Sequence, residues 1–287
     1  MRSGERRLNS LEIIVAVGAL AAVLFVSIGF AHAGDGPKLR SAVALVQDAE
    51  SGETLYAKNS ETILPIASIT KLMTAIVVLE RGLDLEERVV VSAADVRATR
   101  GSHGGRLRPG SVFTRDELLL VALMASDNRA AAALGRTYPG GTDAFVAAMN
   151  AEAARLELHD TRFADPTGLS QHNVSSAQDL ARLVRVAHGY PLIRDYSTRP
   201  SARVDTPRGG MRFRNTNSLV RLEAWDIELS KTGYLDVAGR CLVMHMRVAS
   251  RELVVILLDS WGKYTRVADA RRIRKWLESS AAREPHG

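Results

Sequence analysis

The sequence predicts an α+β protein: an antiparallel sheet covered by helices, with an inserted all-helical subdomain at about residues 83–190. Two observations carry this prediction. Strand patterns joined by tight turns occur near both ends of the chain, whereas the stretch between them has helical periodicity and is rich in alanine. The chain has 287 residues, 46% of them hydrophobic, which is enough for a substantial core. Hairpins with helices segregated around them favour one covered sheet, with a functional site between the two parts.

The first 33 residues differ from the rest of the chain and are expected to be a signal peptide. Three arginines among the first seven residues precede an apolar run of 18 residues, Ile13–Phe30, and the Ala-His-Ala at 31–33 is typical of a cleavage site. The run is also just long enough to span a bilayer, so an uncleaved N-terminal anchor is the alternative, and only then would the protein contact the membrane. Either way, residues 34–287 are expected in the periplasm or otherwise outside the cytoplasm.

Composition excludes several kinds of partner and chemistry. The formal net charge of +6 suits an anionic polymer, but no basic patch alternates with aromatic residues, so no nucleic-acid partner is expected. Cys241 is the single cysteine, which excludes an internal disulfide and a cysteine–zinc site. The seven histidines lack the His-x-x-x-His and His-Glu-x-x-His spacings, so neither a metal nor a cofactor is predicted.

Two hairpins are expected to supply most of the sheet. "SAVALVQDAESGETLYAKN" predicts two strands around a turn at residues 49–52. "RCLVMHMRV" and "ELVVILLDS" predict two more strands across residues 249–251. Residues 195–230 are rich in Arg, Asn, Thr and Gly and are expected to form short strands and loops.

Helical periodicity, together with capping and stop signals, predicts the helices. The first is expected after Ser68 as far as Gly82, and the second opens with a capping box at Thr114 and Glu117 before "ELLLVALMA". Two more are expected at about 142–158 and at about 177–188, the latter ending before Gly189 and Pro191. The last is expected to run through Trp276 and Leu277.

The stretch "PIASITKLMTA" at residues 65–75 allows two interpretations. A serine just before an apolar helical run satisfies unpaired N–H groups at the helix start, so Ser68 is an N-cap in the first. In the second it is a nucleophile, because Lys71 lies one turn further on and its amine shares a face with the Ser68 hydroxyl. The Ser-x-x-Lys pair alone is too short to decide.

Two further motifs decide in favour of the nucleophile. Ser-Asp-Asn at 126–128 falls in the break between two helical runs, and Lys-Thr-Gly at 231–233 opens a strand-like stretch. Each alone is more typical of a cap or turn. With the Ser-x-x-Lys pair, in this order along the chain, they form the motif set described for penicillin-binding proteins and class A β-lactamases.

The residue types suit acyl transfer to a serine. Lys71 is expected to be the base that activates Ser68, and its amine must be neutral for that role. Burial and the second cation, Lys231, would lower its pKa from the ordinary value of ~10.4. Ser126 is expected to relay a proton to the leaving nitrogen.

The remaining groups are expected to bind the substrate and the oxyanion. Their roles are an amide contact for Asn128, a carboxylate contact for Lys231 and Thr232, close approach of the strand backbone at Gly233, and an oxyanion hole from the backbone N–H groups of Ser68 and Tyr234.

The chain resembles the low-molecular-weight penicillin-binding proteins, the serine D-alanyl-D-alanine carboxypeptidase and endopeptidase family, over about residues 38–280. The resemblance extends to "ESGETLYAKN", "FVAAMNAEAARLELHDTRFADPTGL", "NVSSAQDLARLV" and "AGRCLVM". It implies a β-lactamase/transpeptidase-like fold, peptidoglycan stem peptides as substrate, and β-lactam antibiotics as covalent inhibitors.

Three segments are most similar to the single-domain D-alanyl-D-alanine endopeptidase branch, often called penicillin-binding protein 7: "FRNTNSLVR", "LSKTGY" and "WGKYTRVADARRIRKWLES". The β-rich C-terminal domain and amphipathic anchor of the larger carboxypeptidases are not expected.

Two departures from the family pattern bear on the reaction. Leu235 stands where the family often has threonine, and Thr216 stands where carboxypeptidases often have the arginine of an Asn-Arg-Asn triplet. Without that arginine, binding of a free terminal D-alanine carboxylate should be weaker. We therefore expect hydrolysis of D-alanyl-diaminopimelate cross-links in cell-wall remodelling, with D-alanyl-D-alanine carboxypeptidase activity as the alternative.

Two other functions are kept as alternatives. A class A-like β-lactamase hydrolyses its acyl-enzyme with a loop glutamate. This chain has no Glu-x-x-Leu-Asn loop, and Asp165 in a comparable region is shorter and more typical of a helix-linking turn. A non-catalytic wall-binding protein would keep the pocket without turnover, but binding alone would not require an activated nucleophile.

Overall fold

The structure, a computed structural model, describes residues 36–101, 105–205 and 209–281. These ranges belong to one compact unit that begins at Gly36. The expected signal peptide at 1–33 lies outside them. Within the described ranges, no helix has both the length and the apolar character needed to cross a membrane.

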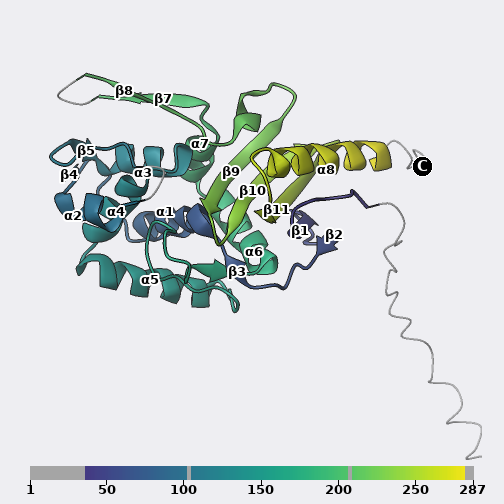
Figure 1. The fold of residues 1–287 in the computed structure, drawn as a ribbon, viewed down its shortest axis with the longest axis horizontal. Coiled ribbons are helices and arrows are strands. Elements are labelled where there is room, and N and C mark those ends of the chain that lie inside the picture. Colours follow the sequence, from purple (N-terminus) through teal and green to yellow (C-terminus); the bar gives the residue numbers. More distant parts are fainter. Residues whose placement is uncertain (1–35, 102–104, 206–208, 282–287) are drawn as a thin grey trace, which may run out of the picture. The chain divides into compact units, whose positions relative to one another are not determined.

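A five-stranded antiparallel sheet joins the two ends of the unit, in the order β2-β1-β11-β10-β9 (Figure 1). Its strands are β1 (Val43–Asp48), β2 (Thr54–Lys58), β9 (Asp226–Leu235), β10 (Gly239–Val248) and β11 (Arg251–Ser260). The predicted hairpins β1–β2 and β10–β11 are both present. The two are joined by pairing of β1 with β11, in which Val43 lies opposite Leu258.

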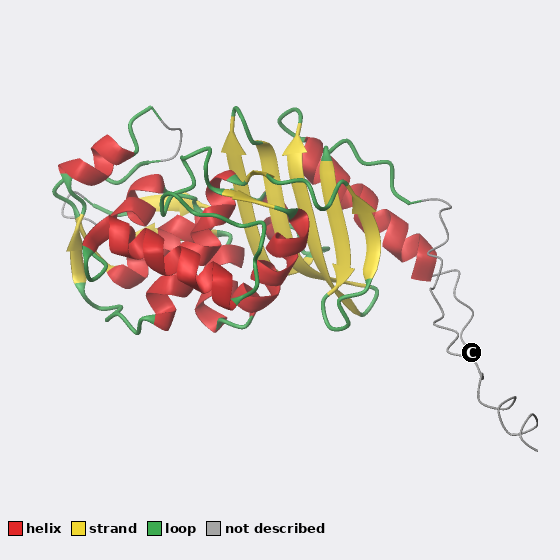
Figure 2. Cartoon of the chain, turned by 90° about the horizontal axis from the view of Figure 1, so that it is seen from below, coloured by secondary structure: helices red, strands yellow, loops and turns green. Residues whose placement is uncertain are grey.

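Both faces of this sheet are buried, which explains the unbroken apolar runs in its central strands. Side chains alternate between the two faces of a strand. In β11, Leu253, Val255 and Leu257 pack toward the long helix α8 (Thr265–Ala281), and the residues between them pack toward the other helices. Figure 2 shows the sheet between the helical part and this C-terminal helix.

Helix α8 is held on the sheet by apolar contacts and by a buried carboxylate. Ala270, Ile273 and Leu277 belong to the cluster that covers this face of the sheet. Asp269 is 0% exposed and accepts hydrogen bonds from the backbone N–H and the hydroxyl of Ser41, both at 2.7 Å. A buried carboxylate satisfied in this way ties the start of the unit to its last helix.

The helical part packs on the opposite face of the sheet and shares one continuous apolar core with it. Its helices are α1 (Lys71–Glu80), α2 (Ala93–Ala98), α3 (Arg115–Met124), α4 (Asn128–Arg136), α5 (Gly141–Arg155), α6 (Ala177–His188) and α7 (Pro191–Thr198). The capping box predicted at Thr114 and Glu117 is present at the start of α3. Helix α6 has the predicted bounds and lies against the sheet.

Short elements connect these parts. Three two-stranded ladders pair β3 (Leu64–Pro65) with β6 (Val174–Ser175), β4 (Arg88–Val90) with β5 (Val112–Thr114), and β7 (Ser201–Val204) with β8 (Met211–Arg214). Two 3-10 helices are η1 (Ala67–Thr70) and η2 (Ser218–Arg221).

Helix α7 was not predicted, because Pro191 was interpreted only as the end of the preceding helix. Proline after Gly189 reads as a helix stop, but at the first position of a helix it costs no hydrogen bond and presets the backbone. Pro191 occupies that position in α7. The helix packs against β9, where the Ser197 hydroxyl accepts the Ser230 backbone N–H at 3.2 Å. The expectation of only strands and loops from residue 195 onward is therefore wrong at its start.

Candidate active site

Ser68 lies in η1, which leads directly into α1. Its side chain caps neither helix: the N-cap positions are Ile66 and Thr70, and neither makes a side-chain cap bond. Instead the Ser68 Oγ and the Lys71 Nζ are hydrogen-bonded at 2.8 Å. The N-cap interpretation of Ser68 is therefore wrong, and its hydroxyl contacts an amine one turn away.

Lys71 is buried beneath Ser68. Its Nζ donates to Asn128 Oδ1 at 2.7 Å and to the Thr167 backbone carbonyl at 2.5 Å. Burial lowers the pKa of Lys71 to about 7, although the carboxylates of Asp165 and Asp127 oppose the shift. Near neutral pH a large fraction of the amine is unprotonated and able to accept the serine proton.

The second lysine of the site is buried as well. Lys231 was predicted to help lower the pKa of Lys71, for which burial is the largest cause. Repulsion between two neighbouring ammonium groups disfavours the charged form of both. Burial lowers the pKa of Lys231 well below its ordinary value, and the charges of Lys71 and Arg266 add to the decrease.

The break between α3 and α4 directs Ser126 and Asn128 to the same site. Ser126 has φ of +58°, in the left-handed region that non-glycine residues rarely adopt. Asp127 has a structural role, since it is the N-cap of α4 and accepts hydrogen bonds from the helix's first backbone N–H groups. Ser126 Oγ accepts a hydrogen bond from Lys231 Nζ at 2.9 Å.

The Lys-Thr-Gly motif lies in the second half of β9, rather than at the start of a strand as predicted. β9 is an edge strand of the large sheet. Lys231 is 1% exposed and also donates to the Thr232 carbonyl at 2.9 Å. The hydroxyls of Thr232 and Thr216 are hydrogen-bonded at 2.6 Å. Thr216, which stands where carboxypeptidases often have an arginine, therefore lies directly beside the Lys-Thr-Gly motif.

Gly233 allows β9 to lie directly against η1. A Cβ at this position would meet the Ile66 carbonyl oxygen at 3.0 Å and the Ser68 backbone nitrogen at 3.2 Å. The sequence predicted close approach of a substrate here, and the structure adds close approach of the protein's own backbone. The strand segment that precedes Tyr234 therefore lies beside the nucleophile.

The motif residues open onto one cleft of about 520 Å³ between the helical part and β9. Its lining includes Ser68, Ser126, Asn128, Thr216, Thr232 and Tyr234. A cleft of this size accommodates a short peptide. The two buried lysines lie behind the serines, each within hydrogen-bond distance of one of them.

Asp165 shapes a loop beside the site. Its two carboxylate oxygens accept hydrogen bonds from the backbone N–H groups of Thr167, Gly168 and Ser170, and Oδ1 also accepts the Thr167 hydroxyl. Asp165 lines a neighbouring pocket and not the cleft that contains Ser68. The structure therefore favours the turn interpretation of Asp165 over the role of a deacylation base.

Arg266, in the first turn of α8, belongs to the site but was not singled out from the sequence. It lines the cleft, and its Nη1 donates to the backbone carbonyls of Gly233 at 2.8 Å and Cys241 at 3.0 Å. Burial lowers the pKa of its guanidinium to about 10. No sequence signal distinguishes it, because several other arginines follow in the same helix.

The substitution Gly168→Ala should destabilise the loop that holds the Thr167 carbonyl against Lys71. Gly168 has φ of +83°, and a Cβ there would lie 2.0 Å from the Ala67 carbonyl oxygen. We expect a loss of about 2–4 kcal/mol from the left-handed backbone and the clash together, seen as a lower Tm.

The matched control for that substitution is Gly110→Ala. Gly110 has φ of +81°, but a Cβ there meets no atom within 4 Å, so only the backbone cost of about 1–2 kcal/mol applies. The free energy of unfolding of both variants is measured by denaturant unfolding. Equal decreases would show that the clash of the new Cβ with the Ala67 carbonyl oxygen does not destabilise the Gly168→Ala protein.

Fold and site together define an active-serine enzyme of the penicillin-recognising class. A family model described as D-alanyl-D-alanine carboxypeptidase, peptidase family S11, matches residues 31–261. The chain belongs to this family and is a serine DD-peptidase, as its motifs predicted.

Similar proteins support the assignment. The chain is 47% identical to a D-alanyl-D-alanine endopeptidase of Pseudomonas aeruginosa, over 84% of this chain and 78% of that protein. It is 43% identical to a D-alanyl-D-alanine endopeptidase of Escherichia coli K12, over 85% and 79%. The predicted branch is thereby confirmed.

Solved structures confirm the predicted fold. A D-alanyl-D-alanine carboxypeptidase of Mycobacterium tuberculosis aligns with a TM-score of 0.76 at 30% identity, covering 88% of this chain and 94% of that chain. The Streptomyces K15 DD-transpeptidase aligns with a TM-score of 0.79 at 27% identity, covering 84% and 98%.

Proposed function

We propose that this DD-peptidase hydrolyses D-alanyl-diaminopimelate cross-links of peptidoglycan through an acyl-enzyme on Ser68. The observation that carries the proposal is the pairing of each site serine with a buried lysine, Ser68 with Lys71 and Ser126 with Lys231, on one cleft. Lys71, whose pKa is lowered by burial, supplies the proton transfer for which other serine enzymes use histidine.

In the proposed acylation, neutral Lys71 takes the Ser68 proton as Oγ attacks the D-alanine carbonyl. The backbone N–H groups of Ser68 and Tyr234 stabilise the oxyanion, which the close approach of β9 to η1 supports. Ser126 relays to the leaving nitrogen the proton that Lys71 took from Ser68, so the C–N bond breaks and Lys71 is neutral again. Water then hydrolyses the ester, with Lys71 again as base.

The substrate groups are assigned to the rest of the cleft. The Asn128 side chain, which lines the cleft beside Lys71, contacts a stem-peptide amide. Thr232 and Lys231 bind the carboxylate next to the scissile bond, and Gly233 keeps the strand close. A bound carboxylate would favour the charged form of Lys231, so substrate binding raises the pKa that burial has lowered.

Cross-link cleavage is favoured over removal of terminal D-alanine by two observations. The Pseudomonas and Escherichia relatives, which are the more similar ones, are both named endopeptidases. Thr216 is exposed and places a short neutral side chain next to Thr232, so this position adds no guanidinium to Lys231 for holding a free terminal carboxylate. Carboxypeptidase activity is the second candidate, because a Mycobacterium tuberculosis relative at 32% identity has that name.

The choice is tested with purified cross-linked dimers and pentapeptide monomers at equal concentration. We expect kcat/KM for dimers to exceed that for release of terminal D-alanine by about tenfold or more, which is the size of one lost charge-assisted contact. Faster trimming of pentapeptides would contradict the endopeptidase assignment while leaving the family assignment intact.

Thr216→Arg sharpens this test. The exposed position accepts a longer side chain, and a guanidinium there should shift the ratio toward pentapeptides. Thr216→Gln is the matched control, because it adds similar length without charge and should leave the ratio near that of the unmodified protein.

The proposal extends to partners and location. Peptidoglycan stem peptides are the substrate, and β-lactams acylate Ser68 as substrate mimics. The protein acts outside the cytoplasm, in the periplasm, as the N-terminal sequence pattern supports. A β-lactamase function is disfavoured because the Asp165 carboxylate is occupied by its own loop.

A further inference from the structure

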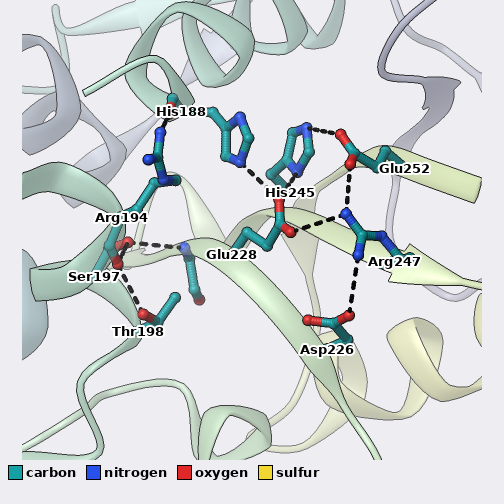
Figure 3. A network of polar contacts seen from close by, with 10 residues as sticks. His188, Arg194, Ser197, Thr198, Asp226, Glu228, His245, Arg247 and Glu252 are labelled. Carbon is teal, nitrogen blue, oxygen red and sulfur yellow. Dashed lines mark hydrogen bonds and ion pairs between the residues drawn. The ribbon is translucent and has the colours of Figure 1, made fainter. Parts of the chain in front are cut away.

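A second cluster of ionisable side chains lies where α6 meets β9 and β10 (Figure 3). His188 is the last residue of α6, Glu228 lies in the first half of β9, and His245 lies in β10. One nitrogen or oxygen atom from each lies within 4.8 Å of the other two. None of the three side chains lines the catalytic cleft.

A β-bulge directs Glu228 toward the two histidines. His245 lies opposite Leu229, but Met246 lies opposite Ile227, so Glu228 is the extra residue on β9. A bulge of this kind leaves one residue unpaired and redirects its side chain. Glu228 Oε2 consequently lies 2.7 Å from His188 Nε2 and 3.4 Å from His245 Nδ1.

His245 contains a buried polar atom that its surroundings do not satisfy. The residue is 2% exposed, and its Nδ1 has no hydrogen-bond partner within the described part of the chain. Its Nε2 faces the Glu252 carboxylate at 3.9 Å. A proton on Nε2 would face that carboxylate and leave the Nδ1 lone pair opposite Glu228. In that tautomer two acceptors face each other at a partly buried position, which is unfavourable unless a cation lies between them.

The His188 ring also faces Glu228. It stacks on the His245 ring, with centroids 3.7 Å apart and planes 7° apart, so both rings present a nitrogen to Glu228 (Figure 3).

We propose that His188, Glu228 and His245 bind one zinc-class divalent metal ion, with solvent completing the coordination shell. Two imidazoles and a carboxylate are a donor set that zinc accepts at about 2.0–2.2 Å. The side chains of His188 and Glu228 are 23% and 25% exposed, so they can rotate slightly and admit the ion.

The neighbouring charges are compatible with this site. Arg247 contacts Glu228 through Oε1, at 3.3 Å, and leaves Oε2 for the metal. Glu252 accepts a bond from the same arginine and lies behind His245, in the position of the carboxylate that commonly supports a histidine ligand. The bound ion would tie α6 to the two strands and steady β9, which also carries Lys231.

No metal site was predicted from the sequence, because the only signal considered was the spacing of histidines within one segment. The three residues of this cluster lie in three different elements. The competing explanation for the cluster is an ion-pair network in which Glu228 serves only His188 and Arg247. The two explanations differ in whether the chain takes up metal.

The test uses the full chain without a polyhistidine tag, freed of metal with a chelator and titrated with Zn²⁺ by calorimetry. We expect one ion per chain and a rise in Tm that Mg²⁺ does not reproduce. Co²⁺ should give the visible absorption of a site with nitrogen ligands.

Variants locate the binding. His188→Gln and Glu228→Gln change partly exposed side chains, and each should weaken Zn²⁺ binding at least about tenfold, since even supporting contacts cost that much. The matched control replaces two exposed histidines together, His159→Gln and His172→Gln, and should bind like the unmodified chain. Penicillin labelling of Ser68 in the His188→Gln protein should be unchanged and shows that it is folded.

Two results would overturn the proposal. One is an absence of stoichiometric Zn²⁺ binding to the unmodified chain, which leaves the ion-pair network as the explanation. The other is Zn²⁺ binding that survives His188→Gln and Glu228→Gln but is lost in the His159/His172 control, which assigns it to surface histidines.

Discussion

Ser68→Ala should abolish covalent capture of penicillin. The unmodified protein is expected to gain the mass of one penicilloyl group within a brief incubation, because Ser68 Oγ is hydrogen-bonded to the buried amine of Lys71. Without the hydroxyl no ester can form, and acylation should fall by at least about 10³-fold. Intact-mass spectrometry measures the adduct directly.

Two comparisons make this result specific. Ser126→Ala should still form the adduct, but more slowly, because Ser126 moves a proton and does not attack the carbonyl. Ser218→Ala, at an exposed serine outside the cleft, should react like the unmodified protein. A mass gain in the Ser68→Ala protein would identify another nucleophile, and rapid repeated turnover of penicillin by the unmodified protein would favour the β-lactamase alternative.

Lys71→Ala should also abolish acylation, whereas Lys231→Ala should chiefly weaken binding. Lys71 is the amine in contact with the Ser68 hydroxyl, whereas Lys231 contacts Ser126 and is proposed to bind the substrate carboxylate. We expect a loss of at least about 10³-fold in the acylation rate for the first, and a rise in the half-saturating penicillin concentration of about tenfold or more for the second.

The pH dependence provides an independent check on Lys71. A general base must be unprotonated, and the pKa of Lys71 is about 7. The acylation rate of the unmodified protein should therefore rise with pH up to about 7, level off above it, and fall about tenfold per unit well below it. Residual acylation by Lys71→Ala that keeps this profile, or a near-normal rate, would mean that another group is the base.

Local sequence patterns predicted much of the fold because they report directly on burial and capping. The helix expected at about 177–188 has those bounds, and the capping box of α3 is present where its residues predicted it. Pro191 shows the limit of this reasoning. Pro191 follows the end of α6 and also begins α7, and the second role shows only in the packing of α7 on β9.

The sequence singled out most of the proposed site residues, and the structure brings Ser68, Lys71, Ser126, Asn128 and the Lys-Thr-Gly motif to one cleft or directly behind it. Their chemical state was not accessible. Burial of Lys71 sets its pKa, and the Thr167 carbonyl that binds its amine comes from a loop distant in sequence.

Three short motifs in a set order were enough to identify the class of the enzyme, because they specify which functional groups are present. The surroundings of those groups depend on the folded chain: both lysines are buried, Asp165 is used by its own loop, and Arg266 comes to the cleft from the last helix. Only the folded chain brings His188, Glu228 and His245 together. Desolvation, hydrogen bonding and charge depend on neighbours in space, and contacts between distant segments leave no periodic pattern in the chain.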